Sequence, residues 1–158
     1  VLGNIMFPMD FLTDWSPAEK KERARYLLDK VNVKDSEDKY PDELSGGMQK
    51  RVGIARAIAL NPEYLFCDEP NSGLDPETSI VIDQLISSLT KELGITTIMN
   101  THDMNSILEI GDNIGFLHKG TILWEGDRHS ILSSDCRQLT DFLCSNTLAR
   151  NIIRPQGR

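Results

Sequence analysis

The spacing of apolar positions along the chain predicts an alternation of helices and strands. Apolar residues lie three and four positions apart in three stretches: residues 24–31, 52–59 and 82–93. A short apolar run at residues 64–67 and a second run at 95–99, rich in residues that favour strands, are typical of strands instead. Residues 1–11 are also apolar and fit either a short helix or a strand that is interrupted at Pro8.

Each predicted helix begins at a recognisable start signal: Ser16-Pro17-Ala18-Glu19, Ser45 or Asp75-Pro76. In the first of these, Glu19 can reach back to the cap at Ser16 and form a capping box. The second helix should stop before Asn61-Pro62, and Gly94 should end the third. Start and stop signals therefore agree with the apolar spacing.

The second half of the chain continues the alternation. A short helix is expected at residues 104–110 and a strand at 113–117. Residues 118–120 resemble the turn of a hairpin that leads into 121–124, and the remainder should be mostly helical, with a loose tail at 155–158. Strands that alternate with helices in this way indicate an α/β fold, with a parallel sheet flanked by helices. The hairpin would make that sheet mixed.

Composition narrows the class of protein. The chain has 158 residues, 39% of them hydrophobic, which suits one soluble globular domain and excludes a disordered chain. It carries 24 acidic and 17 basic residues, a net charge of −7, so binding to a nucleic-acid backbone is not expected. The three cysteines form no Cys-x-x-Cys pair, which argues against a disulfide framework or a zinc site.

Residues 44–48, Leu-Ser-Gly-Gly-Met, lead directly into a predicted helix. The hydroxyl of Ser45 and the backbone N–H groups around Gly46 and Gly47 would suit an anion, above all a phosphate. An ordinary serine cap beside two loop glycines explains the same residues equally well.

Two acids, Asp68 and Glu69, follow the first predicted strand. The carboxyl end of a parallel strand is where α/β sheets place ligand groups. An Asp in that place can hold Mg²⁺, and a neighbouring Glu can orient or deprotonate a water molecule. The alternative is that both acids merely end the strand.

Two further stretches complete the set. Residues 72–75, Ser-Gly-Leu-Asp, form a tight turn directly after the two acids. His102 follows the next strand and could donate a hydrogen bond to a phosphate oxygen, although single histidines are mostly structural. His118 and His129 have no comparable setting and are interpreted as surface residues.

In this order and spacing, LSGGM, YLFCDEP, SGLD and THD resemble the nucleotide-binding subunits of ABC transporters. The resemblance extends from about Val1 to about Gly126 and implies a partial P-loop NTPase fold. It implies a helical subdomain portion at residues 1–60, an α/β core portion at 61–126 and a C-terminal helical segment at 127–158.

The resemblance also implies roles. The signature motif (Ser45, Gly46, Gly47 and Met48) and Asp75 would contact ATP bound to a second copy in a head-to-tail dimer. Asp68 would hold Mg²⁺, Glu69 would be the catalytic base, and His102 would be the switch histidine. A transmembrane permease subunit would dock on the helical subdomain, at the inner, cytoplasmic face of the cell membrane.

Two family motifs are absent. No glycine is followed by lysine, so there is no Walker A loop, and no glutamine precedes Gln49, so there is no Q-loop. The chain looks like the second half of such a subunit. We therefore expect it to bind ATP poorly, to hydrolyse none alone, and to associate with itself through uncovered apolar faces.

Met48 and the run DEPNSGLDPETS resemble, within the family, the Mla-type ATPases that move phospholipids across a bacterial envelope. Two alternatives remain open. One is a soluble ABC ATPase that acts on DNA or ribosomes, although neither a coiled-coil insertion nor a basic linker is present. The other is a truncated binding module that hydrolyses nothing.

Overall fold

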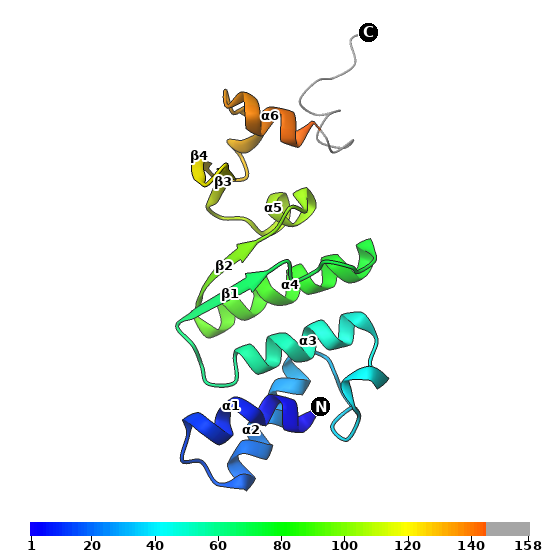
Figure 1. Cartoon of the computed structure of the whole chain (residues 1–158). Helices are drawn as coiled ribbons and strands as arrows, with labels where there is room; N and C mark the ends of the chain where they lie inside the picture. Colours follow the sequence, from blue (N-terminus) through cyan, green and yellow to red (C-terminus); the bar gives the residue numbers. More distant parts are fainter. Residues whose placement is uncertain (145–158) are drawn as a thin grey trace. The chain divides into compact units, whose positions relative to one another are not determined.

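The computed structural model describes residues 1–144, which divide into two compact units at the Asn100–Thr101 boundary (Figure 1). Each unit has its own group of buried apolar side chains, and each is described by itself. The three-part division expected from the sequence stays a prediction.

The first unit holds four α-helices, a 3₁₀ turn and two strands. Their bounds are α1 (Leu2–Leu12), α2 (Pro17–Lys30), η1 (Pro41–Glu43), α3 (Gly46–Ala57), β1 (Tyr64–Asp68), α4 (Pro76–Leu93) and β2 (Thr96–Asn100). The first stretch of the chain, for which the sequence left a helix or a strand open, forms the helix α1. Pro8 lies inside it, where its ring removes the backbone hydrogen bond to Asn4.

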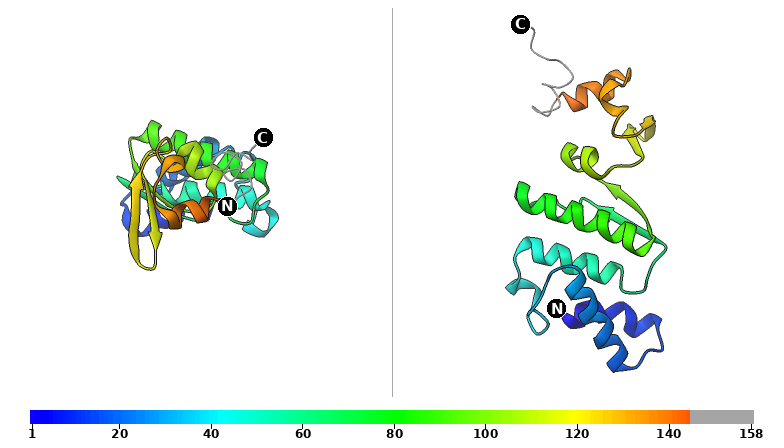
Figure 2. Two further views of the ribbon diagram at one scale, coloured as in Figure 1. Left: turned by 90° about the horizontal axis from the view of Figure 1, so that it is seen from above. Right: turned by 180° about the vertical axis from the view of Figure 1, so that it is seen from behind.

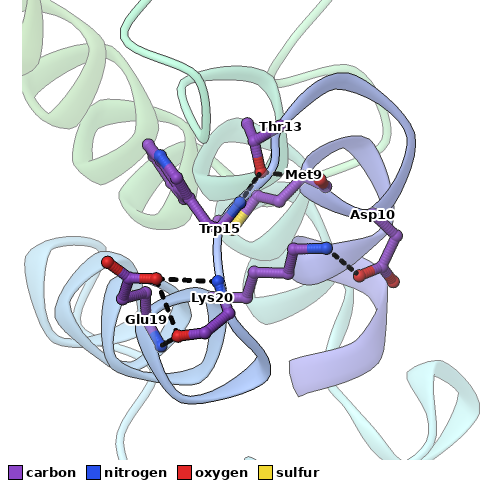
Figure 3. Close-up of polar contacts among 7 residues, drawn as sticks. Met9, Asp10, Thr13, Trp15, Glu19 and Lys20 are labelled. Atoms are coloured by element: carbon purple, nitrogen blue, oxygen red, sulfur yellow. Dashed lines mark hydrogen bonds and ion pairs between the residues drawn. The ribbon is translucent and has the colours of Figure 1, made fainter.

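Side-chain hydrogen bonds and an ion pair stabilise the link between α1 and α2 at both of its ends (Figure 3). Thr13 donates its hydroxyl to the Met9 carbonyl at 2.8 Å, and Lys20 pairs with Asp10 at 3.1 Å. The expected capping box is present, because Ser16 accepts from the Glu19 N–H and Glu19 accepts from the Ser16 N–H. These bonds fix the sharp reversal between the two helices.

The core of the first unit comes from the stripes that the apolar spacing predicted. Ala24, Leu27, Leu28 and Val31 of the α2 region are buried, as are Val52, Ala55 and Ala59 from α3 and the residues after it. From α4, Ile82, Ile86 and Leu89 complete the set, and Gly94 ends this helix in the left-handed conformation. The helical expectations for this unit are confirmed.

β1 and β2 form a parallel pair in which Asp68 lies opposite Asn100. Figure 1 shows the strands in front of α4 and the rear view in Figure 2 shows α4 in front of the strands, so α4 covers one face of the pair. Leu65 is buried on that side.

The other face of the strand pair is open. Phe66 is 72% exposed, and Tyr64 and Ile98 are more than half exposed. A parallel strand is normally covered on both faces, whereas β1 is covered on one face only in the part of the chain that the structure describes. This open face supports the expectation of self-association, which stays a prediction.

The second unit contains α5 (Met104–Ile110), β3 (Ile114–His118), β4 (Thr121–Gly126), η2 (Ile131–Ser133) and α6 (Arg137–Leu143). Met104, Ile131, Leu139 and Leu143 form its buried cluster. The predicted helical remainder is therefore helical in part, and the predicted tail at 155–158 lies outside the described residues.

The hairpin turn has the chemistry that the sequence indicated. Lys119 and Gly120 both have positive φ, which is the backbone of a tight hairpin turn. β3 and β4 pair with each other as a separate antiparallel sheet, so the expectation of one mixed sheet is wrong for the described residues. The two-residue turn between β3 and β4 explains why these two strands pair with each other.

Within residues 1–144, no helix combines the length and the apolar character that crossing a bilayer requires.

A matched pair of leucines tests the packing of the helical core. Leu27 in α2 is 1% exposed, whereas Leu12 at the end of α1 is 70% exposed. Leu27→Ala should lower the free energy of unfolding by about 2–5 kcal/mol, because it removes buried methyl groups and leaves a cavity. Leu12→Ala should change it by less than about 0.5 kcal/mol. Urea denaturation measures both, and equal losses would contradict the packing described here.

Candidate functional site

The carboxyl end of β1 presents Asp68 in a fixed position. Asp68 is exposed, and its Oδ1 atom accepts a hydrogen bond from Asn100 Nδ2 at 2.7 Å. The next backbone N–H, that of Glu69, donates to the Asn100 carbonyl at 2.9 Å, so the parallel ladder continues to the end of the strand. Asn100 thus holds one carboxylate oxygen of an exposed side chain, and such a carboxylate can bind a hydrated cation.

Glu69 has a backbone that glutamate rarely adopts. Its φ is 46°, in the left-handed region that favours glycine, asparagine and aspartate. The residue is half-buried, with its Oε2 atom shielded from solvent, and Lys50 Nζ donates to its carbonyl at 3.3 Å. This conformation turns the chain sharply between the strand and the following turn.

The predicted anion-binding turn begins α3 as expected. Ser45 caps the helix and accepts from the Met48 N–H at 3.3 Å. The N–H groups of Gly46 and Gly47 begin the helix and have no acceptor within it. The side chain of Met48 packs against the core, and its N–H already donates to Ser45. Met48 therefore has fewer groups available to a ligand than the two glycines have.

Gly47 marks a close approach between α3 and α4. A Cβ atom on Gly47 would lie only 2.6 Å from Thr78 Cγ2, and one on Gly46 would lie 3.4 Å from Leu74 Cδ2. The beginning of α3 therefore sits directly on the turn at residues 72–75 and on the first turn of α4. Only glycine permits this distance at position 47.

The turn after the two acids is built from short-range bonds. Gly73 has a φ of 80°, and the Leu74 N–H donates to the Asn71 carbonyl at 3.3 Å. Asp75 caps α4, accepting from the Thr78 N–H at 3.0 Å and from the Thr78 hydroxyl at 2.5 Å. These bonds, the hydroxyl's first, lower the pKa of Asp75, so it stays ionised at neutral pH.

A groove of about 500 Å³ joins α3, β1 and the turn after β1. Gly46, Lys50, Asp68 and Ser72 are among its lining residues. The structure thus brings part of the predicted signature segment, the strand-end Asp68 and the predicted turn to one surface of the first unit.

His102 belongs to the second unit, where it is exposed and directly precedes Asp103, the cap of α5. Of the other two histidines, His129 is exposed, as expected. His118 is half-buried with its ring stacked on Phe116 at 6.2 Å, so it lies only partly at the surface. The pleat of β3 places residues 116 and 118 on the same face.

Cys67 is half-buried in β1, and burial raises the pKa of its thiol. It is therefore a protonated residue that packs against the core.

The strand end fits a magnesium ion that keeps most of its own water. Among residues 1–144 there is no group of three or more His, Cys, Asp or Glu side chains arranged to enclose a metal. Mg²⁺ is commonly held by one or two carboxylates together with substrate phosphates. Asp68, oriented by Asn100, fits that minimal protein contribution.

A protein-family model described as "ABC transporter" matches residues 3–72. The methionine import ATP-binding protein MetN of Carboxydothermus hydrogenoformans is 43% identical over 126 residues, which cover 80% of this chain and 37% of that protein. MetN of Caulobacter vibrioides is 44% identical over 126 residues, covering 80% of this chain and 38% of its own length.

This chain resembles part of an ABC transporter ATP-binding domain. Its fold agrees: the dimeric, post-hydrolysis structure of the ATP-binding cassette MJ0796 bound to ADP and Pi superposes with a TM-score of 0.70. That match has 35% identity and covers 80% of this chain and 56% of MJ0796. The chain spans about 36–46% of the length of the curated relatives that it matches.

Several residues of the site gave no clear signal in the sequence. Thr78 contacts the position of Gly47 and also bonds Asp75. Lys50 lies one turn after Gly46 on the α3 face that borders the groove, a spacing that could have suggested a shared face. Asn100 could have been found from its place at the end of the neighbouring parallel strand.

Two glycines of α3 give opposite predictions for the same substitution. Gly47→Ala should destabilise the fold by about 1–3 kcal/mol, because the added methyl meets Thr78 Cγ2. Gly53 has nothing within 4 Å of its Cβ position, so Gly53→Ala should stabilise the helix by about 0.5–1 kcal/mol.

Thermal and urea denaturation measure both changes. Thr78→Ser, which removes the methyl and keeps the hydroxyl, should restore part of the loss caused by Gly47→Ala. A loss that Thr78→Ser leaves unchanged would contradict the contact.

The cap at Asp75 predicts a pH dependence of stability. Its pKa lies below the ordinary value of 3.8 in the folded state, so its contribution is complete above the unfolded-state pKa and is lost as pH falls through the folded-state pKa. Asp75→Asn should therefore cost more stability at about pH 7 than at about pH 2.5.

The measurement is urea denaturation of both proteins across this pH range. In a Thr78→Ala background the difference between the two pH values should shrink, because the main cause of the lowered pKa is gone. A difference independent of pH would count against the cap.

Proposed function

We propose that this chain is part of the ATP-hydrolysing subunit of an ABC transporter. The observation that carries the proposal is the end of β1, where Asp68, oriented by Asn100 at 2.7 Å, directly precedes Glu69 with its shielded carboxylate. The match to the ABC transporter family model and the likeness to ATP-binding relatives support the same chemistry.

In this proposal the two acids have different tasks. Asp68 faces outward and would hold Mg²⁺, which neutralises phosphate charge when it is bound. Glu69 would accept a proton from, or orient, the water that attacks the γ-phosphate of ATP. Asp68 is exposed, whereas Glu69 is half-buried with its Oε2 atom shielded from solvent.

The beginning of α3 would contact ATP held by a second copy of the subunit. Ser45, Gly46, Gly47 and Met48 start a helix whose N-terminal dipole favours an anion, and the two glycines place no side chain in the way. Asp75 would approach the same dimer interface. The dimeric state of MJ0796 supports an arrangement in two copies.

His102 would contact the γ-phosphate and report its presence. Its place after β2, the strand that pairs with β1, supports this role.

The remaining partner would be a transmembrane permease subunit, which places the protein on the cytoplasmic face of the membrane. The net charge of −7 supports a protein partner over nucleic acid. Neither the soluble DNA- or ribosome-acting class nor the inactive binding module gains support from the relatives named above.

The transported substrate is a separate question. The sequence suggested phospholipids, but the curated relatives are named as methionine import proteins, so they lend that suggestion no support. The residues that carry the likeness lie around the ATP chemistry, and none of them is expected to touch the cargo. Stimulation of ATPase activity by methionine or by phospholipid, in the assembled transporter, separates the two.

The test uses the 158-residue chain beside a longer form that carries a Walker A loop. The longer form should bind ATP and hydrolyse it with Mg²⁺, whereas the shorter chain should bind poorly and hydrolyse none. In the longer form, Glu69→Gln should reduce turnover by about 10²–10⁴-fold with ATP binding retained, because the proton acceptor is lost.

Calorimetry and phosphate release measure these quantities. Glu77→Gln, at an exposed glutamate in the first turn of α4, is the matched control and should leave turnover unchanged. Turnover by the short chain that Glu69→Gln abolishes would contradict the predicted inactivity. A longer form without Mg²⁺-dependent turnover would contradict the proposed function.

A further inference from the structure

A buried carboxylate lies beneath the turn that follows Glu69. Asp83, in the middle of α4, is only 2% exposed, and Asn71 above it is 5% exposed. Asn71 Nδ2 donates to both carboxylate oxygens of Asp83, at 3.3 and 3.4 Å. These two residues are twelve positions apart and come from different elements, so the contact fixes the turn to the helix.

Burying the carboxylate of Asp83 lowers the stability of the fold, and a functional role would explain why an acid is present there. Moving a carboxylate out of water is strongly unfavourable, and an apolar residue would fill the flank of the α4 stripe at no such cost. The neighbouring buried positions Ile82 and Ile86 follow that simpler choice. A buried acid at position 83 therefore indicates that orientation matters there more than stability.

Asn71 transmits this orientation in two directions along the backbone. Its carbonyl accepts from the Leu74 N–H at 3.3 Å, inside the turn that ends at Asp75. On the other side it lies two residues after Glu69, whose carbonyl accepts from the Ser72 N–H at 3.2 Å. A shift of Asn71 would thus displace both the Glu69 backbone and the Ser72–Leu74 turn.

We propose that Asp83 is a positioning residue for ATP hydrolysis, which acts through Asn71 to hold Glu69 and the turn at residues 72–75 in register. The proposal rests on the proposed function, because it assigns Asp83 to the support of that site. Asp83 touches no substrate in this arrangement. It sets the rate of the chemical step and leaves nucleotide affinity largely unchanged.

The test uses the full-length protein in its assembled transporter. Asp83→Ala and Asn71→Ala should each lower kcat by about tenfold or more and change the KM for ATP by less than about twofold. The double variant should lose no more than either single variant, since both remove the same contact. Asp83→Asn, whose amide oxygen can still accept from Asn71, should retain most of the activity.

Leu89→Ala is the matched control, because Leu89 is 2% exposed in the same helix but far along it from Asn71. It should lower the melting temperature at least as much as Asp83→Ala while leaving kcat, measured well below that temperature, within about twofold. If Asp83→Ala does not fold, the other two variants test the inference. Asn71→Ala should lower kcat with little change in KM, and Asp83→Asn should retain most of the activity.

Three outcomes overturn the inference: wild-type kcat in Asp83→Ala, additive losses in the double variant, or an equal kcat loss in Leu89→Ala. Suppose that Glu69→Gln abolishes the wild-type activity but Asp83→Ala keeps the wild-type kcat. This result would contradict the present inference and leave the proposed function intact. A wild-type protein without Mg²⁺-dependent turnover would sink the proposed function and this inference with it.

Discussion

The arrangement of the candidate site depends on how closely α3 approaches α4. The absence of a side chain at Gly47 lets the first turn of α3 rest on Thr78, and Thr78 in turn bonds the cap of α4. Because of this contact, the start of one helix, the start of the next and the turn between β1 and α4 meet in one small region. A bulkier residue at position 47 would push these elements apart, and with them the groups to which phosphate contacts are proposed.

Apolar packing and polar hydrogen bonds have different effects on the structure of the first unit. The stripes of α2, α3 and α4 set the distances between elements but leave each free to rotate slightly or slide. Directional bonds remove that freedom at the points where chemistry is proposed, between Asp68 and Asn100 and between Asn71 and Asp83. The side chains of the candidate site are therefore oriented before any ligand binds, which lowers the entropy cost of binding a ligand.

Much of this could be predicted from the sequence, because helix caps and apolar spacing are local signals. Ser16, Ser45, Asp75 and Gly94 mark helix ends within a residue or two of where they occur. The two acids at the end of β1 were also recognisable, since a strand end has a short, readable pattern.

Other features could not be predicted, because they depend on contacts between distant residues. Nothing local marks Asp83 as buried or Asn71 as its partner, and a continuous apolar run such as residues 64–67 does not say whether both faces are covered. The separate β3–β4 sheet was missed because pairing depends on which neighbour is available. The lipid assignment rested on residues near the nucleotide chemistry, which carry no information about cargo.

The left-handed backbone of Glu69 has an evolutionary consequence. A non-glycine residue in this region costs roughly 1–2 kcal/mol compared with glycine, so the protein keeps glutamate here against its own stability. Under the proposed function, a lineage that no longer hydrolysed ATP would gain stability by drifting to glycine at this position. The identity of residue 69 across descendants of this chain is thus a record of whether selection for the reaction has continued.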